Sequence, residues 1–231
     1  ARIRSIDTSK AQALVGVHAV VTGIDLPTPA APDEMIDLGE GPARIKYLRD
    51  NVLATDKALY RGHAVAAVAA TSLHIAEEAL QLIEVDYEVL SPAVDVLTAM
   101  KQDAPQLHDG LTTSVFGQDT GTQSNIAAQS RDELGDVEAG FAQAAIIAET
   151  EVHTATVHQG YIEPHNGTAQ WSQDGSLTVW TSTQGAFTAQ KQIASVLGLP
   201  IGRVRVIPTE IGGGFGGKIP SYVEPAAALL S

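Results

Sequence analysis

The sequence predicts a mixed α/β or α+β protein with two folded parts, and three observations support this. Over the first hundred residues, strand-like and helix-like periodicities follow one another. A polar stretch rich in Asp, Gly, Thr, Gln and Ser interrupts the pattern, and a hairpin signal, a helix and a strand then follow. We therefore predict a first domain over residues 1–105, a linker over 106–124 and a second domain over 125–231.

The first domain is predicted to combine short strands with one amphipathic helix. Residues 14–22 and 62–70 have the composition of strands, and the second is apolar enough to be covered on both faces. Thr71 or Ser72 can cap the helix that follows. Residues 83–87 then alternate as a strand, so the order strand, helix, strand predicts an α/β unit. The helix is expected to bury Leu73, Ala76, Leu80 and Ile83.

The second domain is predicted to begin with a long strand over residues 144–156. Strands over residues 168–171 and 176–180 flank Asp174-Gly175, which is a hairpin signal. A helix over residues 188–197 follows and ends at a glycine. Gln184 therefore lies where a strand turns into a helix.

The most informative motif is the run Gly-Gly-Gly-Phe-Gly-Gly-Lys over residues 212–218. It follows a predicted strand over residues 203–207 and precedes an apolar run, ending at Leu230, that we expect to be helical. Glycine adopts positive φ freely and lets backbone N–H groups approach a ligand. Two glycines would be enough for a tight turn, so five around one phenyl ring predict an anion-binding loop at a helix N-terminus.

Two nucleotide-binding interpretations of this loop meet obstacles. In the register of a P-loop, Lys218 is followed by Ile219, which has no hydroxyl for Mg²⁺. Three of the glycines also match the dinucleotide fingerprint G-x-G-x-x-G, but the acidic ribose partner would lie beyond Ser231. A nucleotide triphosphatase is therefore not expected, and a dinucleotide-binding oxidoreductase stays an alternative.

The composition limits the partners. The 231 residues are 44% hydrophobic, which supports a folded core, and the formal net charge of −13 argues against nucleic acid. Zero cysteines exclude iron–sulfur ligation by this chain. We expect a cytoplasmic protein without a membrane segment, since the sequence has no long apolar run and no secretory signal. Residues 184–231 carry four basic and two acidic side chains, which predicts a positive pocket.

The histidines do not predict a metal site. His153 and His158 are an odd number of positions apart, so on a strand they would point to opposite faces. We expect His158 and Glu163 to support the pocket and His63 to be an ordinary structural residue.

Six motifs occur in a characteristic order. The first three are Leu53-Ala54-Thr55-Asp56, Gly62-His63-Ala64-Val65-Ala66, and the run Ile-Glu-Val-Asp-Tyr-Glu-Val-Leu over residues 83–90. They resemble the hammerhead domain in the large subunits of molybdenum hydroxylases, the family of xanthine dehydrogenase, aldehyde oxidase and carbon monoxide dehydrogenase. The other three resemble the start of the family's molybdopterin-binding domain. They are the stretch from His158 to Glu163-Pro164, Trp180-Thr181-Ser182-Thr183-Gln184, and the glycine loop.

The resemblance implies a site. Gln184 and Phe215 correspond to residues with catalytic roles, an amide that contacts the oxo ligand of molybdenum and a ring beside the metal. Gly213, Gly214 and Gly216 correspond, with those two, to residues that bind the cofactor, and no side chain ligates the metal directly. The implied cofactor is molybdenum–molybdopterin in the cytosine dinucleotide form, with iron–sulfur clusters and FAD on partner subunits or segments.

The resemblance also implies a reaction, the hydroxylation of an electron-poor carbon with water as oxygen source. The resemblance leaves aldehydes, aromatic N-heterocycles and related compounds as possible substrates. A purine is not favoured, because Ile219 stands where purine-oxidising members have an acidic residue. Carbon monoxide is also less favoured, because members that oxidise it rely on a cysteine and this chain has none. The implied partners are the remainder of the molybdopterin subunit, an iron–sulfur subunit and a flavin subunit. The chain is expected to be a fragment or a split subunit, catalytically incomplete alone because the catalytic glutamate lies elsewhere. A non-catalytic scaffold of the same complex is the alternative.

Overall fold

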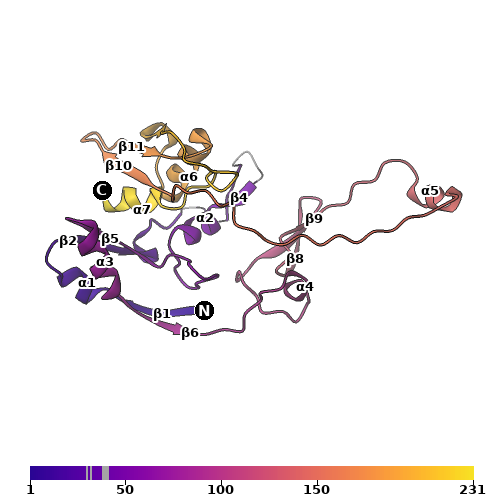
Figure 1. Ribbon diagram of the computed structural model, residues 1–231, viewed down its shortest axis with the longest axis horizontal. Helices are drawn as coiled ribbons and strands as arrows, with labels where there is room; N and C mark the ends of the chain where they lie inside the picture. The colour runs from indigo at the N-terminus through magenta and orange to yellow at the C-terminus, as the bar shows by residue number, and fades with distance from the viewer. Residues whose placement is uncertain (30, 32, 38–41) are drawn as a thin grey trace. The chain divides into compact units, whose positions relative to one another are not determined.

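The structure is a computed structural model that describes residues 1–29, 31, 33–37 and 42–231 (Figure 1). The chain forms two compact units. One comprises Ala1–Val89 with His158–Ser231, and the other comprises Leu90–Val157. Both contain helices and short strands, which confirms the predicted mixed fold class.

The first part of the larger unit contains two separate antiparallel strand pairs. β1 (Arg2–Asp7) pairs with β6 (Glu84–Glu88), and β2 (Val17–Thr22) pairs with β5 (Ala66–Ala70). The predicted strands are therefore present, but β5 and β6 lie in different sheets. The prediction of an α/β unit was wrong, because such a unit returns the second strand to the same sheet as the first.

Helix α3 (Leu73–Gln81) lies between β5 and β6 in the sequence and begins as predicted. The hydroxyl of Ser72 accepts a hydrogen bond from the Ile75 N–H at 3.3 Å, so Ser72 is the N-cap. The predicted buried face was partly wrong. Ala79 is fully buried, whereas the side chains of Leu73 and Leu80 are 76% and 45% exposed. The helix contacts β5, and the residue that it buries is Ala79 rather than either of these leucines.

Five further short elements complete the first part of this unit. They are α1 (Ser9–Ala13), the 3₁₀ turn η1 (Gly23–Asp25), β3 (Met35–Asp37), β4 (Pro42–Arg44) and α2 (Ile45–Val52). β3 and β4 form an antiparallel pair, and α2 follows β4 directly.

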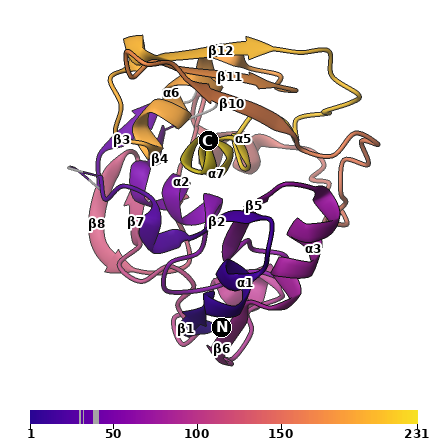
Figure 2. The same cartoon turned by 90° about the vertical axis from the view of Figure 1, so that its left-hand side faces the viewer.

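The second part of the larger unit is a three-stranded sheet covered by two helices. β10 (Gly167–Trp171) and β11 (Leu177–Thr181) form the predicted hairpin, and β12 (Val204–Pro208) pairs parallel to β11. α6 (Ala186–Val196) and the 3₁₀ turn η2 (Ile201–Arg203) connect β11 to β12. Figure 2 shows α6 and α7 (Glu224–Leu230) on the same face of this sheet. The hairpin, both helices and the strand are thus confirmed.

One hydrophobic core joins both parts of the larger unit. On β11, Leu177 and Val179 are fully buried, and Ile193 of α6 packs against them. Val52 and Leu53, at the end of α2, belong to the same cluster. The first part of the chain therefore supplies one wall of the core beneath the sheet of β10, β11 and β12.

The smaller unit contains regular structure where the sequence predicts a linker. β7 (Thr112–Val115) lies between β8 (Gln118–Gln123) and β9 (Ala128–Gln129), and α4 (Val96–Ala99) and α5 (Val137–Gln143) flank these strands in the sequence. Every residue of β8 is exposed, so the strand lacks the apolar alternation that would have revealed it. Residues 106–124 are therefore not irregular, and the domain boundaries stay a prediction.

Residues 144–157 form neither a helix nor a strand, so the predicted long strand is wrong for this chain. Among the described residues of the smaller unit, no backbone hydrogen bond joins this segment to a strand. A strand requires a neighbour for its N–H and C=O groups, and the described strands of this unit supply none. Among the described helices, none has the length and apolar character needed to span a bilayer.

Candidate functional site

The glycine loop follows β12, as predicted, but does not end at a helix. Residues 218–223 separate Gly217 from Glu224, the first residue of α7. The expectation of a loop at a helix N-terminus was therefore wrong. The dinucleotide fingerprint needs its last glycine where the helix opens, so this geometry does not support a dinucleotide site.

Three residues of the loop, Gly213, Phe215 and Gly216, have positive φ. Gly213 and Gly216 have φ values of 97° and 86°, which glycine adopts without strain. Phe215 has a φ of 51°, which is uncommon for a residue with a Cβ, and its side chain is 71% exposed. The loop thus exposes the phenyl ring and holds the Phe215 backbone in a conformation that is unfavourable for residues other than glycine.

Two other glycines are required by close contacts instead. A Cβ at Gly214 would lie 2.5 Å from Oε1 of Gln184, and one at Gly217 would lie 2.7 Å from the ring of Tyr161. Gly214 is not among the residues with positive φ, so the close contact with Gln184, and not the backbone conformation, requires glycine at this position. Its role is to let the loop approach Gln184.

Gln184 lies between β11 and α6 and holds the loop at three points. Its Oε1 accepts hydrogen bonds from the N–H groups of Gly216 at 3.0 Å and Lys218 at 3.3 Å. Its own N–H donates to the carbonyl of Lys218 at 2.9 Å. The N-cap of α6 is Gly185, so Gln184 is not a simple helix-start residue. Within the described part of the chain, its Nε2 has no acceptor.

An ion pair between the buried Lys218 and the partly exposed Glu163 fixes the other side of the loop. The Lys218 side chain is 0% exposed, and its ammonium pairs with Glu163 and lies 5.1 Å from the centroid of the Tyr161 ring. Glu163 also accepts a hydrogen bond from the Gly212 N–H at 2.8 Å. The hydrogen bond from Lys218, and then that from Gly212, lower the pKa of Glu163 to about 2.

Because of this ion pair, Lys218 does not give the site the net positive charge that the sequence predicts. Lys218 is one of the four basic residues counted in the segment 184–231, but its charge is neutralised by Glu163, which lies outside that segment. Two more of the four, Lys191 and Arg203, donate to backbone carbonyls elsewhere. A charge count along the sequence therefore does not give the charge of the site.

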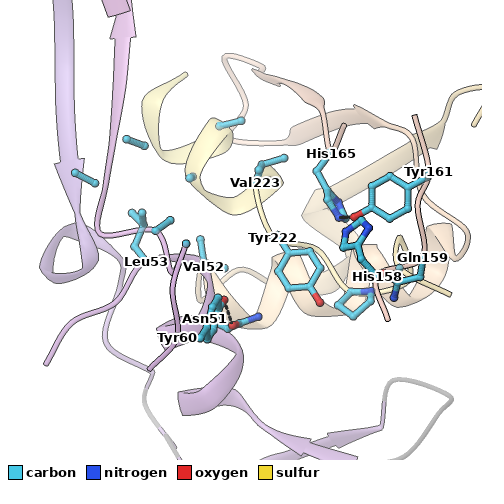
Figure 3. A pocket seen from close by; sticks show the side chains of 18 of the residues that line it. Asn51, Val52, Leu53, Tyr60, His158, Gln159, Tyr161, His165, Tyr222 and Val223 are labelled. Atoms are coloured by element: carbon cyan, nitrogen blue, oxygen red, sulfur yellow. Dashed lines mark hydrogen bonds between the residues drawn. The ribbon is translucent and has the colours of Figure 1, made fainter. Parts of the chain in front are cut away.

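A pocket of about 990 Å³ lies beside the loop (Figure 3). Figure 3 shows His158, Tyr161, His165 and Tyr222 close together on one side of it. The Tyr161 hydroxyl lies 2.9 Å from Nε2 of His165, and the ring of His165 meets that of Tyr222 edge-on at 5.0 Å between centroids. Burial lowers the pKa of His165, which favours the neutral ring.

The opposite wall of the pocket comes from the first part of the chain, with Val52, Leu53 and Tyr60 among its residues. Gly216 and Gly217 line the pocket, but Gln184 and Phe215 do not. The structure thus brings Gln184 and the glycines together at the loop and leaves Phe215 exposed beside them. The sequence analysis did not predict Tyr161, His165 and Tyr222 as residues of the pocket. The aromatic and histidine residues close to Glu163 in the sequence could have indicated Tyr161 and His165.

Two further histidines have partners nearby in the sequence. His63 is buried, with Nε2 2.7 Å from the Asp50 carbonyl and Nδ1 accepting from the Leu59 N–H, as suits a structural residue. His153 pairs with Glu151 at 3.0 Å on an exposed segment. Among the described residues, no group of three or more His, Cys, Asp or Glu side chains could hold a metal ion.

Comparisons with known proteins match this chain over nearly its whole length. Residues 1–91 match the aldehyde oxidase and xanthine dehydrogenase a/b hammerhead domain, and residues 118–231 match the molybdopterin cofactor-binding domain. The carbon monoxide dehydrogenase large chain of Afipia carboxidovorans is 34% identical over 100% of this chain and 28% of its own length. The nicotinate dehydrogenase large molybdopterin subunit of Eubacterium barkeri is 33% identical over 100% of this chain and 49% of its own length.

A solved structure shares the fold. Reconstituted carbon monoxide dehydrogenase from Oligotropha carboxidovorans superposes with a TM-score of 0.76 and 33% identity, over 99% of this chain and 28% of that one. The chain therefore combines a hammerhead domain with residues of a molybdopterin cofactor-binding domain. It belongs to the molybdenum hydroxylase family, among the molybdopterin-binding large subunits, and spans between about a quarter and a half of the length of these relatives.

The loop residues fit a molybdopterin group. Within the described part of the chain, the N–H groups of Gly213, Gly214 and Phe215 have no protein acceptor, and Nε2 of Gln184 is free to donate. A Cβ at Gly216 would meet nothing within 4 Å, so this side of the loop is open. Amide donors next to open space suit the polar edge of a pterin and the oxo ligand of a metal.

Proposed function

We propose that this chain forms part of the cofactor site of a molybdenum hydroxylase that hydroxylates an electron-poor carbon with oxygen from water. The observation that carries the proposal is the three-point attachment of Gln184 to the glycine loop, which leaves the amide Nε2 free beside unpaired N–H groups. A bound molybdenum–molybdopterin would supply the redox chemistry, and the chain would bind and orient it.

In this proposal each loop residue has a distinct role. The free Nε2 of Gln184 would donate to a polar group of the bound cofactor without adding charge, while its Oε1 keeps the loop in place. The N–H groups of Gly213 and Gly214 would bind the cofactor, and Gly216 would leave room for it. Phe215, which is exposed in this chain, would cover the bound cofactor and bound the substrate.

The substrate class and the partners are also proposals. Relatives of this chain are named for carbon monoxide, nicotinate and xanthine, so the family by itself does not select a substrate. We favour an aldehyde or an aromatic N-heterocycle other than a purine, because Ile219 has no polar group for a purine. We also infer the cytosine dinucleotide form of the cofactor, a remaining large-subunit segment with the catalytic glutamate, and partners with iron–sulfur clusters and FAD.

Metal and pterin analysis of the purified assembly tests the proposal. We expect close to one molybdenum and one pterin per large subunit, and strong loss of both in Gly214→Ala, since the added Cβ would displace the Gln184 amide. Gly202→Ala is the matched control, because a Cβ there meets nothing within 4 Å. An active assembly without molybdenum, or normal pterin content in Gly214→Ala, would refute the proposal.

A scaffold function is the second candidate, and one observation favours it. Gly214 and Gly217 are explained by contacts with the chain's own Gln184 and Tyr161, which need no ligand. In this case the loop would fix the packing of the domain only. The assembly would then contain no pterin, and Gly214→Ala would lower stability without any change in cofactor content.

A further inference from the structure

One tyrosine packs against the glycine loop at two positions. A Cβ at Gly217 would lie 2.7 Å from Cε1 of Tyr161, and a Cβ at Gly213 would lie 3.1 Å from the Cβ of Tyr161. The Tyr161 side chain therefore occupies the space beside both glycines. At Gly216, between them, a Cβ would meet nothing within 4 Å. The loop is thus supported by protein at Gly213 and Gly217 and open at Gly216.

The ring of Tyr161 also contacts the lysine at the end of the loop. The Lys218 ammonium lies 5.1 Å from the ring centroid, and the Lys218 side chain is 0% exposed. A buried ammonium is attracted to the negative face of an aromatic ring, and an aliphatic side chain offers no such attraction. The ring therefore holds the loop by its shape at the two glycines and by electrostatics at Lys218.

Two further rings hold Tyr161 in place (Figure 3). Residues 158–166 form neither a helix nor a strand, so side-chain contacts fix the position of this tyrosine. Its hydroxyl lies 2.9 Å from Nε2 of His165, and the two rings meet edge-on at 5.5 Å between centroids. The ring of His165 in turn meets that of Tyr222, which lies two positions before α7. A column of three rings therefore connects the start of α7 to the glycine loop.

We propose that Tyr161 is a positioning residue, whose ring sets the position of the loop from Gly213 to Lys218 and thereby of the N–H groups that would bind the cofactor. The hydroxyl orients the ring through His165. Burial lowers the pKa of His165, and the neutral ring can accept the hydroxyl hydrogen bond at Nε2. The effect on the cofactor rests on the proposed function, whereas the effect on the loop requires no bound cofactor.

Hydrogen exchange tests the effect on the loop, with the assembly expressed in a strain that makes no molybdopterin. Tyr161→Leu should accelerate the exchange of amides 212–218 by at least about thirtyfold, because the loop loses both its aromatic support and the attraction to the buried ammonium. Amides of β11 should keep their exchange rate, since Tyr161 is not part of the hydrophobic core cluster. Unchanged exchange in the loop, or equal acceleration in β11, would overturn the proposal.

Two further variants separate the ring from the general loss of a tyrosine. Tyr161→Phe keeps the ring and loses only the hydroxyl, so its loop amides should exchange within about fivefold of the wild-type rate, the scale of one neutral hydrogen bond. Tyr87→Leu is the matched control, because Tyr87 lies on β6 and is 41% exposed. It should change the exchange of the loop by less than about twofold. Exchange in Tyr161→Phe as fast as in Tyr161→Leu would show that the ring does not hold the loop.

Cofactor content tests the consequence for binding. In the assembly expressed with molybdopterin, Tyr161→Leu should lower the pterin content about tenfold, as expected when the groups around a cofactor lose their support. Tyr161→Phe and Tyr87→Leu should stay within about twofold of wild type. Normal pterin content in Tyr161→Leu would overturn the role in cofactor binding. Wild-type assembly without pterin would instead refute the proposed function, and exchange in the cofactor-free loop would still decide whether Tyr161 positions it.

Discussion

The ion pair between the buried Lys218 and the partly exposed Glu163 should respond unequally to the loss of either partner. Glu163→Gln keeps an acceptor for the Gly212 N–H but leaves the Lys218 ammonium, at 0% exposure, without its counter-ion. An ammonium buried in this way costs about 3–5 kcal/mol. We expect the lower end, because Ser182 Oγ lies 3.4 Å away and remains as a partner. Lys218→Met should cost less, since the Glu163 side chain is 27% exposed and can be hydrated.

Urea unfolding followed by the fluorescence of Trp171 and Trp180 can measure both changes, since these tryptophans lie in the strands of the same sheet. The double variant Glu163→Leu/Lys218→Met should recover most of the loss, because an apolar pair leaves no buried charge. Two single variants of equal cost, or a double variant as unstable as the sum of the singles, would refute the reasoning.

Three further predictions concern the site and the sheet. Gln184→Glu keeps the acceptor oxygens for the loop but replaces the neutral amide donor with a negative charge, so kcat per bound cofactor should fall roughly tenfold to a hundredfold. The lowered pKa of Glu163 means that its stabilisation is complete above pH 4.5 and lost as the pH falls toward about 2. Lys218→Met should flatten this acid decline in unfolding free energy, and an unchanged pH profile would contradict the assignment. Trp171→Phe removes the hydrogen bond from Nε1 to the Ala228 carbonyl at 2.8 Å and should cost about 1 kcal/mol in urea unfolding; no change would indicate that water replaces it.

The sequence was informative where local pattern and burial coincide. On β11, Leu177 and Val179 alternate with less buried residues, and the Asp174-Gly175 turn closes the hairpin as predicted. Helix α6 buries Ala189 and Ile193 on its predicted face. The strand β8 was missed because its residues are polar and exposed, and hydrophobic periodicity cannot reveal such a strand.

The sequence by itself determined the family, the strand–helix order of the second part, and the position of Gln184 between β11 and α6. These features depend on residue types at fixed spacing in the sequence, and such patterns do not depend on tertiary contacts. Tertiary structure decided which strands pair, why Gly214 must be glycine, and that Lys218 is neutralised by a carboxylate fifty-five positions earlier. The physical reason is the same in each case: pairing, close approach and charge compensation depend on groups distant in the sequence, and no local pattern records them.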